Sequence, residues 1–482
     1  MNKRFLLIGI ITFVILAVAI TLFVINPGNP QKCGDGICDA KELANLNLCP
    51  KDCINKCGNE ICESEESCSN CEPDCGRCSV TSGESRFGIH IGRLDLRSEI
   101  SELGDIYSRI NFGADAFGWK LLKGAEASRS QCRACCDPAR SDCSCVEGFY
   151  YCTPDNRGNI IGKDTADEFY ADNYEILFMV APSSYDQNEP KNSRTVGYPA
   201  EEQTYKDYIG YLVRQYPGVK YWEVFNEANN RDYWGDTAEN YARLVTLTSD
   251  EIKRYCPECK VGISLTSATQ TAEWFNTMTS LCNSIEFMDL HQYESNNMDA
   301  LKEFEESHLT SWKNSCPGVE IISTETGVVS EPITFKGRVW ELGTSETAQA
   351  QDSIKYLTMM FNAGYGKIYY YLFDVDYVPG LEDIYEHNGL LNEDGSKKIA
   401  FGTYQLMIEK LDHFTSITKL TEGQYKYTFS NKSPVYVLWC DSRNCSLSSE
   451  ISGTVKVTNY LGNEETKQAS QIVLSESPIF VE

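Results

Sequence analysis

The chain has 482 residues, of which 42% are hydrophobic and 11% aromatic, so it can bury the cores of two or three domains and lacks the composition of a disordered protein. Its formal net charge of -26 argues against nucleic acid and anionic membrane surfaces as partners, because they would repel it. The composition therefore indicates a globular protein whose partners are not polyanions.

The first predicted element is a membrane anchor. After Lys3 and Arg4 the chain runs without a charge from Phe5 to Ile25, a length that spans a bilayer as a helix. The two basic residues place the N-terminus in the cytoplasm and the rest of the chain outside. A cleaved signal peptide, giving a secreted form, is the alternative, although its apolar region is usually shorter. We expect a single-pass cell-membrane protein, with residues 1–31 as cytoplasmic start and anchor.

The 22 cysteines agree with export, because so many thiols suit an oxidising compartment. They fall into four groups, each with an even number, which favours disulfides within each group without fixing their pairing. The groups lie between Cys33 and Cys78, between Cys132 and Cys152, at Cys256, Cys259, Cys282 and Cys316, and at Cys440 and Cys445.

Residues 32–79 form a cysteine-rich segment with a twofold repeat, in which CGDGIC and CPKDC are followed by CGNEIC and CEPDC. Each copy is too short to own a hydrophobic core, so disulfides would have to hold it. Zinc bound by the cysteine pairs, or calcium bound by the interspersed acidic residues, is the alternative. Export and the absence of histidine in the segment favour disulfides over zinc. We predict a stiff, disulfide-rich stalk.

Between residues 80 and 413, short apolar runs alternate with amphipathic stretches, which is typical of βα units around a parallel sheet. Helical stretches begin at Thr204, Ala238 and Thr347. Eight candidate strands begin at Phe87, Ile106, Tyr174, Val219, Lys260, Ile285, Val319 and Lys367. The pattern predicts a (β/α)8 TIM barrel. Its largest insertion, which holds Cys132 to Cys152, is predicted as a disulfide-stapled loop at the barrel mouth, with a metal site as the alternative.

Residues 414–482 change to short alternating strands, including YKYTFS, SPVYVLWC and GTVKVTNY. This alternation predicts a small C-terminal β-sandwich packed on the barrel. Cys440 and Cys445 bracket a hairpin turn within it. We expect a supporting domain, with carbohydrate binding as the alternative.

Polar residues stand where several barrel strands are predicted to end. The fourth strand ends in Asn226 and Glu227, the sixth in His291 and Tyr293, and the seventh in Glu325. Active sites of such barrels gather at the carboxyl ends of the strands. A single strand-end glutamate could meet solvent or cap a helix. Two of them, with Asn, His and Tyr nearby, predict a pair of catalytic carboxylates.

Glycoside hydrolysis needs one carboxyl group to protonate the leaving oxygen and a second to attack or to activate water. With these motifs the chain resembles the clan A retaining (β/α)8 glycoside hydrolases, most of all families 5 and 39. The resemblance implies Glu227 as acid/base, Glu325 as nucleophile and Asn226 as partner of the sugar 2-hydroxyl, with no metal or organic cofactor required.

The same resemblance supplies three further residues, because clan members often carry an Arg on strand two and a His-x-Tyr on strand six. Here these are Arg109, His291 and Tyr293. An arginine and a tyrosyl hydroxyl beside Glu325 would keep that carboxylate ionised and aimed at the anomeric carbon. A salt bridge in the barrel floor is the alternative for Arg109.

The sugar-binding surface departs from the clan. Strand eight carries Tyr371 and Phe373 where many members have a tryptophan platform, and Ala228 replaces the frequent proline after the Asn-Glu pair. No histidine ends strand three. Trp119 and Trp234 are further candidates to stack on sugar rings, or else they pack the loops.

Taken together, these patterns predict a membrane-anchored, extracellular glycoside hydrolase that cleaves a β-linked oligo- or polysaccharide with net retention. Its partner is the carbohydrate substrate, and we expect neither nucleic acid nor an obligate protein partner. The carboxyl groups of Glu227 and Glu325 should lie about 5 to 5.5 Å apart. A non-catalytic glycan-binding or adhesion protein on the same barrel is one alternative, and a transglycosylase is another.

Overall fold

A computed structural model describes the part of the chain that holds the predicted barrel strands and the C-terminal region. The described residues are 84–90, 97–104, 106–113, 144–146, 149–151, 175–182, 196–199, 202–266, 272–292, 309–331, 333–335, 338–340, 344–371, 387–392, 394–442 and 445–482. All of them belong to one compact unit, Glu60–Glu482. The predicted anchor and stalk lie outside these ranges. Within them, no helix combines the length and the apolarity needed to cross a membrane.

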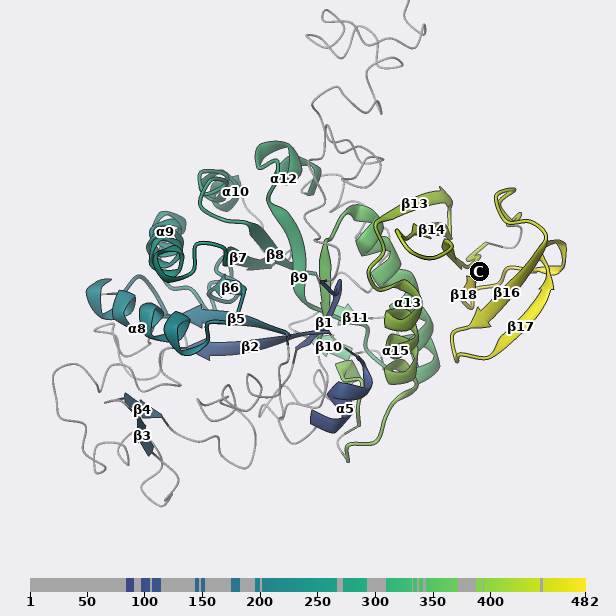
Figure 1. Cartoon of the computed structure of the whole chain (residues 1–482), viewed down its shortest axis with the longest axis horizontal. Coiled ribbons are helices and arrows are strands. Elements are labelled where there is room, and N and C mark those ends of the chain that lie inside the picture. The colour runs from purple at the N-terminus through teal and green to yellow at the C-terminus, as the bar shows by residue number, and fades with distance from the viewer. Residues whose placement is uncertain are drawn as a thin grey trace, which may run out of the picture. The chain divides into compact units, whose positions relative to one another are not determined.

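Eight parallel strands close into a barrel (Figure 1). In chain order they are β1 (Phe87–His90), β2 (Tyr107–Gly113), β5 (Glu175–Ala181), β6 (Tyr221–Val224), β7 (Lys260–Thr266), β8 (Phe287–His291), β9 (Glu320–Thr326) and β12 (Lys367–Tyr370). Each strand pairs with the next of the series, and β1 pairs with both β2 and β12, which closes the circle. All eight predicted strands are confirmed, and with them the predicted barrel.

Helices follow most of the barrel strands and surround them (Figure 1). They are α5 (Arg97–Glu102), α8 (Glu202–Gln215), α9 (Ala238–Tyr255), α10 (Ala272–Thr279), α12 (Thr310–Ser315), α13 (Glu346–Ala363) and α15 (Ile399–Leu411). The long ones begin where the sequence offers caps: Thr237 accepts from the Asn240 amide before α9, and Ser345 from the Ala348 amide before α13. Gly364 ends α13 at φ 100°, a left-handed conformation that glycine adopts freely. The three predicted helices are thus present.

The barrel interior is packed in layers, because alternate residues of every strand face inward. Six large apolar or aromatic side chains, one from each of six strands, form the layer nearer the strand N-termini. They are Tyr107, Leu177, Tyr221, Phe287, Ile322 and Tyr369. The other two strands contribute Gly88 and Gly262. A Cβ on Gly262 would lie 2.2 Å from the Phe287 ring, so glycine is what lets that ring cross the barrel.

The C-terminal region forms one six-stranded antiparallel sheet. The predicted strands are therefore present, but the prediction of a sandwich of two sheets is wrong. In spatial order the strands are β13 (Ser416–Thr421), β14 (Gln424–Thr428), β15 (Val435–Leu438), β18 (Ile479–Val481), β16 (Thr454–Asn459) and β17 (Glu464–Gln468). One face packs on α13, where Tyr427 meets Thr358 at 3.2 Å. The other face is covered by Ile451 and by Ala469 of the 3-10 helix η7 (Ala469–Gln471). Because the barrel covers one face and loops cover the other, a second sheet is not needed.

Two short hairpins complete the described secondary structure. They are β3 (Ser144–Val146) with β4 (Phe149–Tyr151), and β10 (Ile333–Phe335) with β11 (Arg338–Trp340). The first hairpin lies in the cysteine-rich insertion that follows β2.

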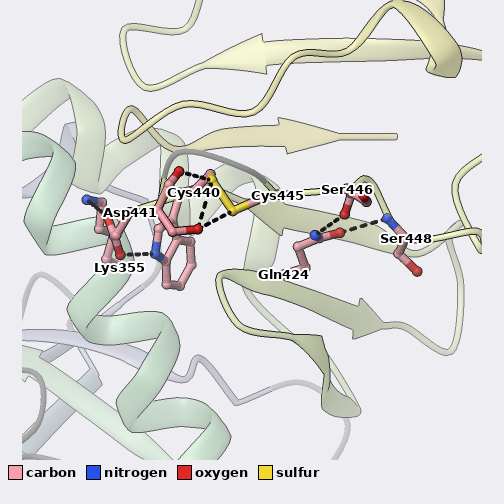
Figure 2. The surroundings of a disulfide bond; sticks show 9 residues. Lys355, Gln424, Cys440, Asp441, Cys445, Ser446 and Ser448 are labelled. Atoms are coloured by element: carbon pink, nitrogen blue, oxygen red, sulfur yellow. Dashed lines mark hydrogen bonds and ion pairs between the residues drawn. A yellow bond between two sulfur atoms is a disulfide. The ribbon is translucent and has the colours of Figure 1, made fainter.

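Three disulfides lie in the described part of the chain and confirm the prediction of pairing within groups. They are Cys256–Cys259, Cys282–Cys316 and Cys440–Cys445. Figure 2 shows the last of these beside Asp441, whose carboxylate accepts from Lys355 of α13 at 2.8 Å. On the other side of the disulfide, Gln424 donates to the Ser446 carbonyl at 2.8 Å. The disulfide therefore fixes the loop through which the sheet contacts the barrel's α13.

Candidate active site

A polar layer lies directly above the aromatic layer, two residues further along each strand. Thus Tyr107 is followed by Arg109 on β2, and Tyr221 by Glu223 on β6. The other members of this layer that carry polar groups are His90, Ser264, Asp289, Thr324 and Tyr371. The alternation of β-strands therefore places charged side chains inside the barrel at its C-terminal end, on a floor of packed rings.

Glu227 reaches the barrel mouth through an unusual turn after β6. Phe225 and Glu227 have φ angles of 67° and 44°, a left-handed region that side chains other than glycine rarely adopt. The turn is held from both neighbouring strands. Phe225 N donates to the Val180 carbonyl at 2.8 Å, and Glu227 N donates to Ser264 Oγ at 3.2 Å. Such local strain is typical of functional sites, and here it brings Asn226 to Arg109 and Glu227 to His291.

The Glu227 carboxylate is held at both oxygens. Its Oε1 lies 3.0 Å from Nδ1 of His291, and its Oε2 accepts from the Asn230 side-chain amide at 2.8 Å. The side chain keeps 12% of its surface exposed, so a ligand in the barrel mouth can reach it.

Glu325, near the end of β9, faces Glu227 across His291. Arg109 Nη1 donates to Glu325 Oε1, and His291 Nδ1 lies 3.5 Å from Oε2. His90 Nδ1 is 3.5 Å from Oε1. One carboxylate oxygen of Glu227, one of Glu325 and a ring nitrogen of His291 all lie within 4.8 Å of one another. The two predicted catalytic carboxylates are therefore neighbours.

Arg109 connects the deep layer to the mouth. Its guanidinium is completely buried and donates from Nε to Glu223 Oε2 at 2.7 Å and from Nη2 to Asn226 Oδ1 at 2.8 Å, besides its contact with Glu325. The predicted contact with Glu325 is present. The alternative, a buried salt bridge, is present as well, because Glu223 is also completely buried.

The electrostatics of the site follow from burial and paired charges. Burial lowers the pKa of His291, but Asp289 and Glu325 outweigh it and hold that pKa well above its ordinary value. Burial raises the pKa of Glu227, but the hydrogen bonds from His291 and Asn230 leave it lower than usual. Burial raises the pKa of Glu223 to about 8, even though Arg109 opposes this. His291 and Glu227, both buried, thus compete for a proton.

Among the residues that the structure describes, two groups of side chains offer the ligand types of a metal site. One consists of Glu223, Asp289 and His291, and the other of Glu227, His291 and Glu325. In both, Arg109 and a protonated His291 already supply the positive charge that the carboxylates face. A metal ion would have to displace those cations. The arrangement is therefore better suited to proton transfer than to metal binding.

The remaining predicted residues differ in their placement. Tyr371 is half-buried and packs edge-on against His90, with ring centroids 4.9 Å apart. Trp234 is 1% exposed, donates from Nε1 to the Thr237 carbonyl at 3.0 Å and packs on Phe225. This burial does not support a sugar platform at Trp234, because the indole already fills the core of its loop. Trp119, Tyr293 and Phe373 lie outside the described residues.

Sequence reasoning missed His90, Glu223 and Asp289, which stand inside apolar strands rather than after them. For two of them, Glu223 and Asp289, the sequence does contain an indication. Glu223 interrupts the aromatic run YWEVF, and Asp289 precedes His291 by two residues, the spacing that puts both on one face of a strand. A charge on the inward face of a barrel strand needs a partner, which is a reason to expect the buried network found here.

No protein-family model matches the sequence, and no curated protein matches it. Solved structures do match. A family 39 glycoside hydrolase from the gut symbiont Bacteroides cellulosilyticus WH2 superposes with a TM-score of 0.53 and 14% identity, over 82% of this chain and 80% of that one. A glucosidase from Croceicoccus marinus gives 0.50 and 12%, over 83% and 96%. At these identities the likeness establishes a shared fold, and that fold is the one expected from the clan A resemblance.

Proposed function

We propose that this chain is a glycoside hydrolase that cleaves β-linked glycans with net retention. One observation carries the proposal: carboxylate oxygens of Glu227 and Glu325 lie within 4.8 Å, at the ends of two different barrel strands. Retaining enzymes keep their carboxyl groups about 5 to 5.5 Å apart, whereas inverting enzymes leave about 6.5 to 9.5 Å for a water molecule. The observed spacing supports the first class.

In the first step, Glu325 attacks the anomeric carbon while the bond from that carbon to the leaving oxygen breaks. Arg109 fits Glu325 for this role, because its guanidinium donates to the carboxylate and holds it in place. Glu227 gives its proton to the leaving oxygen. Asn226, whose Oδ1 accepts from Arg109 Nη2, is proposed to bind the sugar 2-hydroxyl.

In the second step, water attacks the anomeric carbon and Glu227 takes its proton, while the bond to Glu325 breaks. Esterified Glu325 carries no negative charge. His291 and Glu227 then lose a nearby carboxylate that favoured protonation, so their pKa values fall during the intermediate. Glu227 can therefore serve as acid in the first step and as base in the second.

We also propose that the catalytic unit works outside the cell. The three disulfides of the described residues support this, because such bonds persist in oxidising compartments. The membrane attachment rests on the apolar segment from Phe5 to Ile25 alone. Cell-surface proteolysis of intact cells, followed by immunoblotting of the C-terminal sheet, tests the extracellular placement. Full protection from the protease would contradict it.

The activity is tested with the purified full-length protein on a panel of β-linked oligosaccharides and aryl β-glycosides. Proton NMR of the first-formed sugar should show the β-anomer, and Glu325→Ala should abolish turnover while glycan binding remains. Glu320→Gln is the matched control, because Glu320 is a buried carboxylate of the same strand without contact to the pair. Initial α-anomer would overturn retention, and glycan binding without turnover in wild type would favour a binding protein. Transfer to an added sugar acceptor would identify a transglycosylase.

A further inference from the structure

Beneath the proposed acid/base lies a second carboxylate that touches neither the barrel mouth nor Glu227. Asp289 is completely buried, and its Oδ2 lies 2.8 Å from Nε2 of His291. The opposite ring nitrogen, Nδ1, lies 3.0 Å from Glu227 Oε1. The imidazole therefore bridges a carboxylate inside the barrel and the carboxylate at its mouth.

Asp289 is held rigidly from two neighbouring strands. The Thr324 amide donates to its Oδ1 at 2.6 Å, and the hydroxyls of Thr324 and Ser264 both lie 2.8 Å from its Oδ2. Such a carboxylate is a fixed acceptor, because moving it would leave these donors without a partner in a site closed to water.

We propose that Asp289 is a positioning residue that acts through His291, so that Glu227 and His291 form one acid–base unit with a single mobile proton. Asp289 accepts the Nε2–H of His291 and thereby turns Nδ1 toward Glu227. The proton between them then has two positions. Either Nδ1–H donates to the ionised Glu227, or the protonated Glu227 donates to Nδ1. The move between them changes no other bond.

The charges around His291 favour keeping that proton. Carboxylates face the ring from three elements: Asp289 on β8, Glu325 on β9, and Glu227 after β6. Glu223 on β6 adds its charge only above about pH 8, because burial raises its pKa to about that value. The opposing charge is the Arg109 guanidinium on β2. His90 on β1 adds none, because burial and Arg109 lower the pKa of its ring. Asp289 and Glu227 lie within 3.0 Å of the two ring nitrogens, so the unit holds its last proton to high pH.

The catalytic consequence rests on the proposed function. The Glu227–His291 unit can protonate a leaving oxygen only while it carries its proton. The basic limb of the pH profile of kcat/KM therefore reports the loss of that proton. Removing the Asp289 charge should weaken proton binding. A poor leaving group needs the proton, whereas an activated one, such as 2,4-dinitrophenolate, leaves without it. Asp289 should therefore matter only for the former.

The test compares wild type with Asp289→Asn on two aryl β-glycosides, one with a poor and one with an activated leaving group. We expect the basic limb of kcat/KM for the poor leaving group to fall by about 1–3 pH units. The activated substrate should be nearly unaffected near pH 6. Glu320→Gln should leave the limb in place. In a His291→Gln background the effect of Asp289→Asn on the limb should vanish, since it acts through the ring. An unchanged limb in Asp289→Asn would overturn the proposal.

A second measurement does not depend on turnover. NMR of ring-labelled histidine follows the five histidines of the chain, with His291→Gln to assign the signal. In wild type the His291 ring should remain cationic well above pH 6.5. Titration at or below that value would overturn the proposal even if Asp289→Asn fails to fold. Conversely, a His291 that stays cationic in a protein without glycosidase activity would refute the proposed function and leave the proton arrangement standing.

Discussion

Arg109 donates its Nε–H to Glu223 over 2.7 Å, and neither side chain has any surface exposed to solvent. This pair anchors the proposed nucleophile from below, because the same guanidinium donates to Glu325. The aromatic layer beneath it excludes water from the other side. Breaking the pair should therefore both destabilise the fold and displace Glu325, because one guanidinium holds both carboxyl groups.

Above about pH 8, where Glu223 is ionised, Arg109→Met should destabilise the fold strongly, because it leaves that carboxylate buried without its cation. Removing one partner of a buried ion pair costs about 3–5 kcal/mol. The matched control is Arg243→Met, which breaks the exposed pair with Glu202 at 3.3 Å and should cost about 1 kcal/mol or less. Urea unfolding followed by circular dichroism measures both. Equal losses would contradict the interpretation.

Glu227→Ala should impair turnover in a way that depends on the leaving group. With a poor leaving group we expect a loss of about 10²–10⁴-fold, the usual contribution of general acid catalysis. With 2,4-dinitrophenyl glycosides the first step should be nearly normal, and added azide should restore turnover by replacing the activated water. The product would be a β-glycosyl azide. A loss of equal size for every leaving group would exclude Glu227 as the acid.

The Asp289–His291 contact should stabilise the fold over a defined pH range. The pKa of Asp289 is lowered despite burial, with His291 as the main opposing cause, so its contribution is present above the ordinary value of about 3.9 and is lost as pH falls through the lowered one. The pKa of His291 is raised, so its contribution is complete below about 6.5 and is lost as pH rises through the raised value. The pair should therefore contribute most between about pH 4 and 6.5.

Urea midpoints of wild type and Asp289→Asn at pH 5.5 and pH 9.5 check this sign. Taking the difference between the two proteins removes the opposite contribution of His90, whose own pKa is lowered. The difference should be larger at pH 5.5. A larger difference at pH 9.5 would mean that the contact does not involve a charged His291.

Gly262→Ala should test the packing of the barrel interior. Its new methyl group would lie 2.2 Å from the Phe287 ring, which is fully buried in the layer of packed side chains. Overpacking of this kind costs about 1–3 kcal/mol. Gly402→Ala is the matched control, since nothing lies within 4 Å of its Cβ position inside α15. It should stabilise the protein by about 0.5–1 kcal/mol, because alanine favours helix. Thermal unfolding measures both shifts.

The barrel could be predicted because each strand carries its own local signal. Apolar runs of strand length recur between amphipathic stretches, and the order of the strands around a closed parallel barrel follows the chain. The C-terminal β-sandwich was predicted wrongly for the converse reason. The alternation of apolar and polar residues shows that a strand buries one of its faces. It does not show whether a second sheet or the barrel covers that face. Here α13 takes one face through contacts such as Tyr427 with Thr358.

The sequence by itself determined the strand ends and hence the pair Glu227 and Glu325, because strand termini of a parallel barrel meet at one end. Only the tertiary structure decided what lies beneath them. Glu223 and Asp289 read as isolated charges along the chain, and their meaning depends on partners from other strands, Arg109 and His291. Likewise, the burial of Trp234 in its loop, which the sequence does not show, argues against the predicted role of Trp234 as a sugar platform. Distances between strands and exclusion of water set these charges and contacts, and neither is encoded in the spacing of residues along one strand.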